Sequence, residues 1–144
     1  MNVAISGSRT FRDRAFVERV VDRLAARGDF ILYGDAPEGV DLFVQDYIVN
    51  VGTIDARIYK AHWKTFGKGA GHERNARMIE DAAMLIAIFA RGPRTPGTSN
   101  ACRLALARGL PVHVFHEGAW TSEPADRAYA EAIGNTAAGH EHWG

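Results

Sequence analysis

The segment Gly71-His72-Glu73-Arg74-Asn75-Ala76-Arg77-Met78 is followed by the apolar run Met84–Phe89 and then by Pro96-Gly97-Thr98. The apolar run is typical of a buried strand, because side chains on both of its faces are apolar. A charged cluster precedes this strand and a glycine turn follows it. In an open sheet of parallel strands, ligands bind outside the C-terminal ends of the strands. If this strand is parallel to its neighbours, we expect the cluster and the turn to face one crevice.

Similar short apolar runs occur on both sides of this segment, each bounded by turn residues. They predict five strands, at residues 3–5, 30–33, 56–59, 84–89 and 112–115. Apolar residues recur at helical spacing between the runs. The expected helices begin after a Thr10-x-x-Asp13 capping box, after Gly39, near Glu73 and at Thr98 or Ser99.

Strands that alternate with helices imply a parallel sheet covered on both faces. We therefore expect an α/β fold, a three-layer Rossmann-like domain whose mainly parallel sheet has about five strands. The whole chain, residues 1–144, is expected to form one domain. Its core spans about residues 2–116, and residues 117–144 form a C-terminal helix at 124–133 and a frayed tail at 134–144.

Composition narrows the function classes. Lys and Arg number 17 and so do Asp and Glu, so the chain exerts no overall pull on a polyphosphate backbone, and nucleic acid is disfavoured as a partner. The single cysteine, Cys102, falls in an apolar helical pattern and predicts a core residue in a reducing compartment. No run approaches the roughly 20 apolar residues that cross a bilayer. We expect a cytoplasmic protein with no membrane partner, no structural metal and no cofactor.

Two early loops carry candidate binding residues. In Gly7-Ser8-Arg9, glycine permits close backbone approach and Arg9 offers a planar fork for an anion; the alternative is a tight turn with a solvated arginine. In the loop after the second strand, Gly34-Asp35 places a carboxylate beyond a buried strand, where it can accept hydrogen bonds from ribose. Asp41 either joins it or simply favours the positive end of a helix.

Two later segments carry the other candidates. Residues 61–71 are rich in glycine, basic and aromatic side chains; we expect Phe66 to pack on the core, while Trp63 either packs or stacks on a base. The turn Gly97-Thr98-Ser99 offers backbone and hydroxyl donors at the start of a helix, which suits a phosphate-binding site. Alternatively, Thr98 is only a helix cap.

Arg74 is the central candidate of the chain. It is expected in the first turn of its helix with Glu73 and Asn75, where the helix dipole disfavours a cation. An unfavourable placement suggests a specific anionic partner. The alternative is a surface charge whose stem covers apolar neighbours.

These motifs together resemble the SLOG superfamily of Rossmann-like nucleotide-binding domains, in their order and spacing most closely its YspA-like branch. The resemblance covers about residues 2–115. It implies that the chain binds a nucleotide or a nucleotide-derived ligand with a phosphate near Gly97-Thr98. It also implies a homodimer or a higher homo-oligomer.

The same superfamily contains the Lonely Guy phosphoribohydrolases, and His72-Glu73-Arg74 with Met78 is similar to the part of their signature that carries the catalytic arginine. Their glutamate has no counterpart, because Ala101 stands at the matching position. Alanine cannot stabilise an oxocarbenium-like centre or activate water. The expected function is therefore binding or sensing of a nucleotide-like, phosphorylated small molecule.

Two alternatives stay open. One is an N-glycosidase acting on a nucleoside monophosphate, with Arg74 as substrate clamp and Asp35, Asp41 or Glu73 as the catalytic carboxylate. The other is a single-stranded DNA-binding module, like the DprA relatives in the superfamily. It would use the following basic residues: Arg9, Lys64, Lys68, Arg74, Arg77, Arg91 and Arg94.

Overall fold

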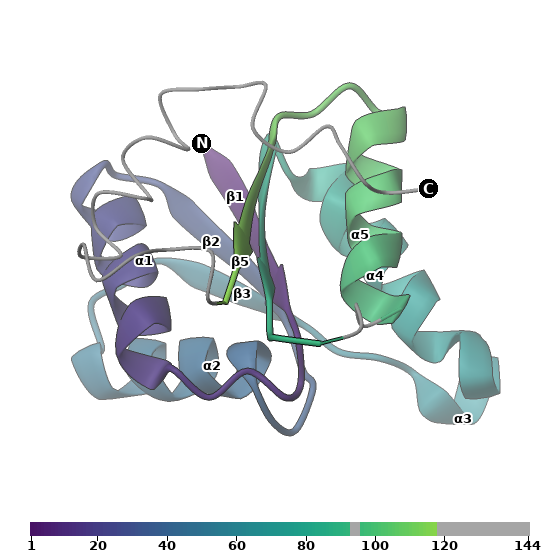
Figure 1. The fold of residues 1–144 in the computed structure, drawn as a ribbon. Helices are drawn as coiled ribbons and strands as arrows, with labels where there is room; N and C mark the ends of the chain where they lie inside the picture. Colours follow the sequence, from purple (N-terminus) through teal and green to yellow (C-terminus); the bar gives the residue numbers. More distant parts are fainter. Residues whose placement is uncertain (93–95, 118–144) are drawn as a thin grey trace.

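The computed structural model describes residues 1–92 and 96–117, and its centre is a single sheet (Figure 1). The five strands are β1 (Asn2–Gly7), β2 (Phe30–Gly34), β3 (Ala56–Tyr59), β4 (Met84–Phe89) and β5 (Val112–His116). They lie in the order β3-β2-β1-β4-β5, and every neighbouring pair is parallel. The predicted α/β class with a five-strand parallel sheet is confirmed.

Helices cover both faces of the sheet, as Figure 1 shows. One face carries α1 (Arg14–Ala26) and α2 (Val40–Val51), and the other carries α4 (Ala70–Asp81) and α5 (Pro96–Ala107). Alternate strand residues supply the two cores: Val3 and Ile5 contribute to one, and Ala4 to the other. A strand buried on both faces needs apolar residues at every position, which is why the continuous runs were recognisable.

The strand order places a topological switch between β1 and β4. From β1 the chain adds β2 and β3 on one side, and then it crosses back to place β4 on the other side of β1. The loops leaving β1 and β4 therefore diverge at the C-terminal edge of the sheet. A crevice forms at such a point, and ligands of open α/β sheets bind there.

Three helix starts differ from the prediction. Asp13, not Thr10, caps α1, since its carboxylate accepts a hydrogen bond from the backbone N–H of Phe16 at 3.1 Å. Helix α4 begins at Ala70, directly after a 3₁₀ turn (Gly67–Gly69), so Arg74 lies in its second turn. Helix α5 begins at Pro96, whose fixed φ suits a first helical position, so Thr98 is inside the helix and not its cap.

The short helix α3 (Trp63–Phe66) extends beyond the sheet, at the lower right of Figure 1. Phe66 is 46% exposed there, so the prediction that it packs on the core is wrong. Trp63 is 53% exposed. Neither residue belongs to the two apolar cores, because the segment that leaves β3 continues past the sheet before α4 returns (Figure 1).

No helix within residues 1–92 and 96–117 is both long enough and apolar enough to cross a membrane. The expected helix at 124–133 and the tail at 134–144 lie outside the described residues.

We expect Gly7→Ala to destabilise the fold by about 2 kcal/mol, the typical cost of inserting an atom into a packed interior. A Cβ at Gly7 would overlap Cγ2 of Val40 and lie 2.9 Å from the carbonyl oxygen of Ile88. Gly69→Ala is the control, since no atom lies within 4 Å of the position of its Cβ. Urea unfolding measures both; equal midpoints for the two variants would contradict this packing of β1 against α2.

Candidate functional site

A cavity of about 280 Å³ opens at the C-terminal edge of the sheet. The loop after β1, the loop after β2, the segment from α3 into α4 and the first turn of α5 form its walls. Eight of the residues that the sequence singles out line it: Gly7, Arg9, Asp41, Trp63, Arg74, Asn75, Gly97 and Thr98. The charged cluster before β4 and the glycine turn after it thus share one hollow.

Arg74 lies at the centre of a hydrogen-bonded network and is only 9% exposed. Its Nη1 donates to Oδ1 of Asp35 at 2.8 Å, and its Nε donates to Oδ1 of Asn75 at 3.0 Å. Asp35 also accepts from the backbone N–H of Ala61 at 3.2 Å. The pair therefore connects the ends of β2 and β3 to the second turn of α4.

Asn75 extends this network to α5. Its Nδ2 donates to the carbonyl oxygen of Gly97 at 3.0 Å and to Oδ1 of Asn100 at 3.3 Å. The side chain is 2% exposed, so these bonds are formed away from solvent. Asn75 thereby fixes the position of Arg74 relative to the Gly97-Thr98 turn, for which the sequence predicts phosphate binding.

Gly34 does not line the cavity, and the network explains why this position is a glycine. A Cβ there would lie 2.6 Å from Nη1 of Arg74 and 2.7 Å from Oδ2 of Asp41. The arginine and the two carboxylates approach each other over the bare backbone at the end of β2. Glycine permits the approach because it has no side chain.

Asp41 is a buried carboxylate in the cavity wall, 7% exposed, and its Oδ2 accepts the backbone N–H of Ala36 at 3.1 Å. Burial of the carboxylate raises its pKa to about 6. The nearby Arg74 and this hydrogen bond lower the pKa, but their effect is smaller than that of burial. The pKa of Tyr33 is raised as well, first by the burial of its hydroxyl group and second by the negative charge of Asp41. Asp41 therefore changes charge at about pH 6.

At the end of β1 and in the loop after it, one residue has a structural role and its neighbours line the cavity. Ser8 is buried and does not line the cavity; its Oγ accepts the backbone N–H of Ala90 at 3.0 Å and holds the ends of β1 and β4 together. Ser6 does line the cavity, and its Oγ donates to Oγ1 of Thr98 at 3.4 Å. Arg9 lines the cavity and is exposed.

Part of the wall was not singled out as a small-molecule site from the sequence: Ser6, Ala36, Lys68, Gly71, His72 and Pro96. Lys68 was named only for the single-stranded DNA alternative. The basic, glycine-rich composition of residues 61–71 was a usable signal for Lys68. No local pattern distinguishes Ala36 or Ser6.

Three further candidates lie away from the cavity wall. Ser99 is buried within α5. Asp35 contacts the site through Arg74. Glu73 forms an ion pair with Arg77 at 2.8 Å, and Arg77 also donates to the backbone of Lys60. Arg94 lies outside the described residues. In residues 1–92 and 96–117, no group of three or more His, Cys, Asp or Glu side chains is placed to hold a metal ion.

The raised pKa of Asp41 makes stability depend on pH with a defined sign. Because the folded-state pKa of about 6 exceeds the ordinary aspartate value of 3.8, the native state keeps a proton that the unfolded state loses between these values. This stabilisation is complete below about pH 4 and is lost as the pH rises through 6. In Asp41→Asn we expect the free energy of unfolding not to fall in this pH range. For the wild type the fall is up to about 3 kcal/mol, at about 1.4 kcal/mol per pKa unit.

Urea unfolding at pH 4 to 7.5 measures the effect. The control is Asp46→Asn, on the same helix, with a side chain that is 42% exposed. We expect this control to keep the part of the pH dependence that arises from Asp41. Parallel stability curves for wild type and Asp41→Asn would contradict a buried, titrating Asp41.

Comparison with known proteins adds a relative but no family description. No protein-family model matches the chain. It is similar to the Gene 61 protein of Mycobacterium phage D29, with 30% identity over 120 residues that cover 78% of this chain and 94% of the phage protein. Nearly the whole phage protein aligns, so the relation extends well beyond one motif. The chain belongs to the family of the phage D29 Gene 61 protein.

Proposed function

We propose that the cavity binds a nucleotide or a nucleotide-derived, phosphorylated small molecule, and that the protein acts as a binding or sensing module. The observation that carries the proposal is the convergence of Arg9, Arg74 and the turn Gly97-Thr98 on one hollow at the topological switch. These residues come from three separate segments of the chain. They are also the residues through which the sequence resembles the SLOG superfamily.

The charges of the wall favour an anion. Arg9 and Lys68 are exposed cations on the cavity, while Arg74 already has Asp35 as a partner. Gly97 and Thr98 lie in the first turn of a 12-residue helix, where free N–H groups and the helix dipole attract negative charge. Asp41 opposes an anion when ionised, and its protonation below about pH 6 removes this repulsion.

The size of the cavity favours a single nucleotide or a smaller ligand. Its 280 Å³ lies just below the usual range of about 300–1,000 Å³ for small-molecule sites. A dinucleotide would extend into solvent. The proposed ligand is therefore of the size of a nucleoside monophosphate or a ribose phosphate.

Arg9→Ala tests the anion site without disturbing the buried network. We expect it to weaken the binding of adenosine 5′-monophosphate about tenfold, since one exposed charge-assisted contact is lost. Arg108→Ala is the matched control, because Arg108 is exposed just beyond the far end of α5, at the opposite edge of the sheet. Calorimetric titration measures both; equal affinities for the two variants would contradict the assignment.

One observation favours a second candidate, a nucleotide N-glycosidase. Among the described residues that line the cavity, Asp41 is the carboxylate, and its pKa of about 6 suits a general acid. The N-glycosidic bond would break as the proton of Asp41 passes to the departing base. Water would attack the anomeric carbon, and the Asp41 carboxylate so formed would take the proton that this water loses. Ala101 is fully buried in α5 and supplies no such group.

Chromatographic assay of free base from nucleoside monophosphates tests this candidate. If the protein is such an enzyme, we expect base release to decline as the pH rises above about 6, because Asp41 loses its proton. Asp41→Asn should abolish the release. Glu73→Gln should retain it, since Glu73 pairs with Arg77 away from the cavity. If the wild type releases no detectable base, the glycosidase candidate is contradicted and the binding function remains as the proposal.

A further inference from the structure

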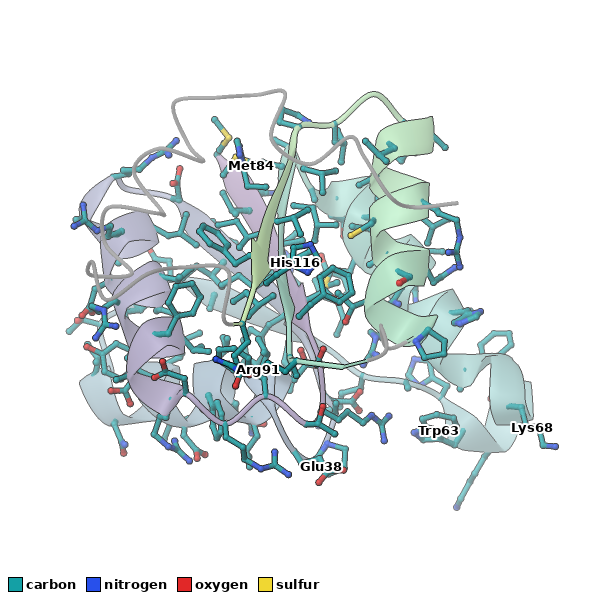
Figure 2. All side chains as sticks on the ribbon, in the orientation of Figure 1. Glu38, Trp63, Lys68, Met84, Arg91 and His116 are labelled. Carbon is teal, nitrogen blue, oxygen red and sulfur yellow. The ribbon has the colours of Figure 1, made fainter. Side chains whose placement is uncertain are left out.

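Trp63 has an exposure that the fold does not require. It lies on α3 beyond the sheet edge, and Figure 2 shows it on the side of that helix facing the C-terminal strand ends. Its side chain is 53% exposed, although an aromatic ring of this size is usually mostly buried. It is also part of the cavity wall. One part of the ring therefore contacts protein and another faces the hollow.

The ring of Trp63 lies beside Gly71. Cη2 of Trp63 lies 4.0 Å from the place where a Cβ of Gly71 would be, which is ordinary van der Waals distance. The edge of the indole thus rests beside the backbone of the first turn of α4. A Cβ at this position would only just contact the indole, so the ring keeps its place in the cavity wall without displacing the helix.

The wall combines two sets of chemical groups. Arg9, Gly97 and Thr98 offer donors and positive potential, whereas the segment from α3 into α4 contributes the exposed indole of Trp63. A phosphate suits the first set. A planar, electron-poor ring suits the second, because base–aromatic stacking needs a free ring face and little hydrogen-bond geometry.

We infer that Trp63 is the platform on which the base of the ligand stacks, so the site takes a base-bearing mononucleotide in preference to a bare sugar phosphate. The inference rests on the proposed function and deepens it. Stacking accepts any base, so Trp63 separates ligands with a base from those without one. The identity of the base is left to other contacts.

Phe66 supplies a matched control for this assignment. It lies on the same short helix, is 46% exposed and does not line the cavity. Removing its ring changes the exposed apolar surface of α3 without touching the wall. Any loss that Trp63→Ala shows and Phe66→Ala does not is therefore a loss of the wall contact.

Calorimetric titration with four probes tests the inference: inorganic phosphate, ribose 5-phosphate, adenosine 5′-monophosphate and uridine 5′-monophosphate. We expect the two mononucleotides to bind the wild type about tenfold more tightly than ribose 5-phosphate. Trp63→Ala should remove that advantage and leave ribose 5-phosphate within about twofold of its wild-type affinity. Trp63→Phe should retain most of it, and Phe66→Ala should match the wild type.

Tryptophan fluorescence gives a readout that a purely structural role would not move. The mononucleotides should quench the emission of the wild type, and the quenching should disappear in Trp63→Phe although binding persists. If ribose 5-phosphate binds as tightly as the mononucleotides, or if Trp63→Ala binds all probes like the wild type, the inference is overturned and the phosphate site stands. If none of the four probes binds, the proposed function fails as well.

Discussion

The ion pair between Arg74 and Asp35 is the contact on which the arrangement of the site depends. Its 2.8 Å bond joins side chains that are only 11% and 26% exposed, so both charges lie largely out of water. Breaking such a pair leaves an uncompensated charge, which is costly in a low-dielectric environment. Through Ala61 and Asn75 the pair also fixes the start of α3 and the first turn of α5. Three of the four wall segments are thus connected through this one ion pair.

The centre of the sheet could be predicted from sequence because β1, β2 and β4 are buried on both faces. The runs that form β3 and β4 have the expected bounds, and β1, β2 and β5 extend by one or two residues. Helix starts were less predictable. A 3₁₀ turn runs directly into α4, so the glycines at 67 and 69 do not stop the chain from turning helically. Pro96 likewise initiates α5 before the hydroxyl residues expected to cap it.

Most of the site residues were recognisable singly, but their pairings were not. Asp35 and Arg74 are 39 positions apart, and nothing local to either one indicates the other. The need for glycine at position 34 follows only from the arginine that lies over it. Asp41 looked like a residue favouring a helix dipole; its raised pKa arises from burial by segments that are distant in sequence. The ion pair, the glycine and the raised pKa all arise from contacts between segments distant in sequence, which no local sequence motif encodes.

The amide of Asn75 has one further consequence. It presents an oxygen to the guanidinium on one side and hydrogens to two oxygens on the other. Aspartate, of nearly the same shape, would face those two oxygens with a third oxygen and would add a negative charge in a place that water barely reaches. Leucine would fill the space and satisfy none of the three groups. The polarity of this one side chain, with a different end toward each helix, keeps α4 and α5 in register at the mouth of the hollow.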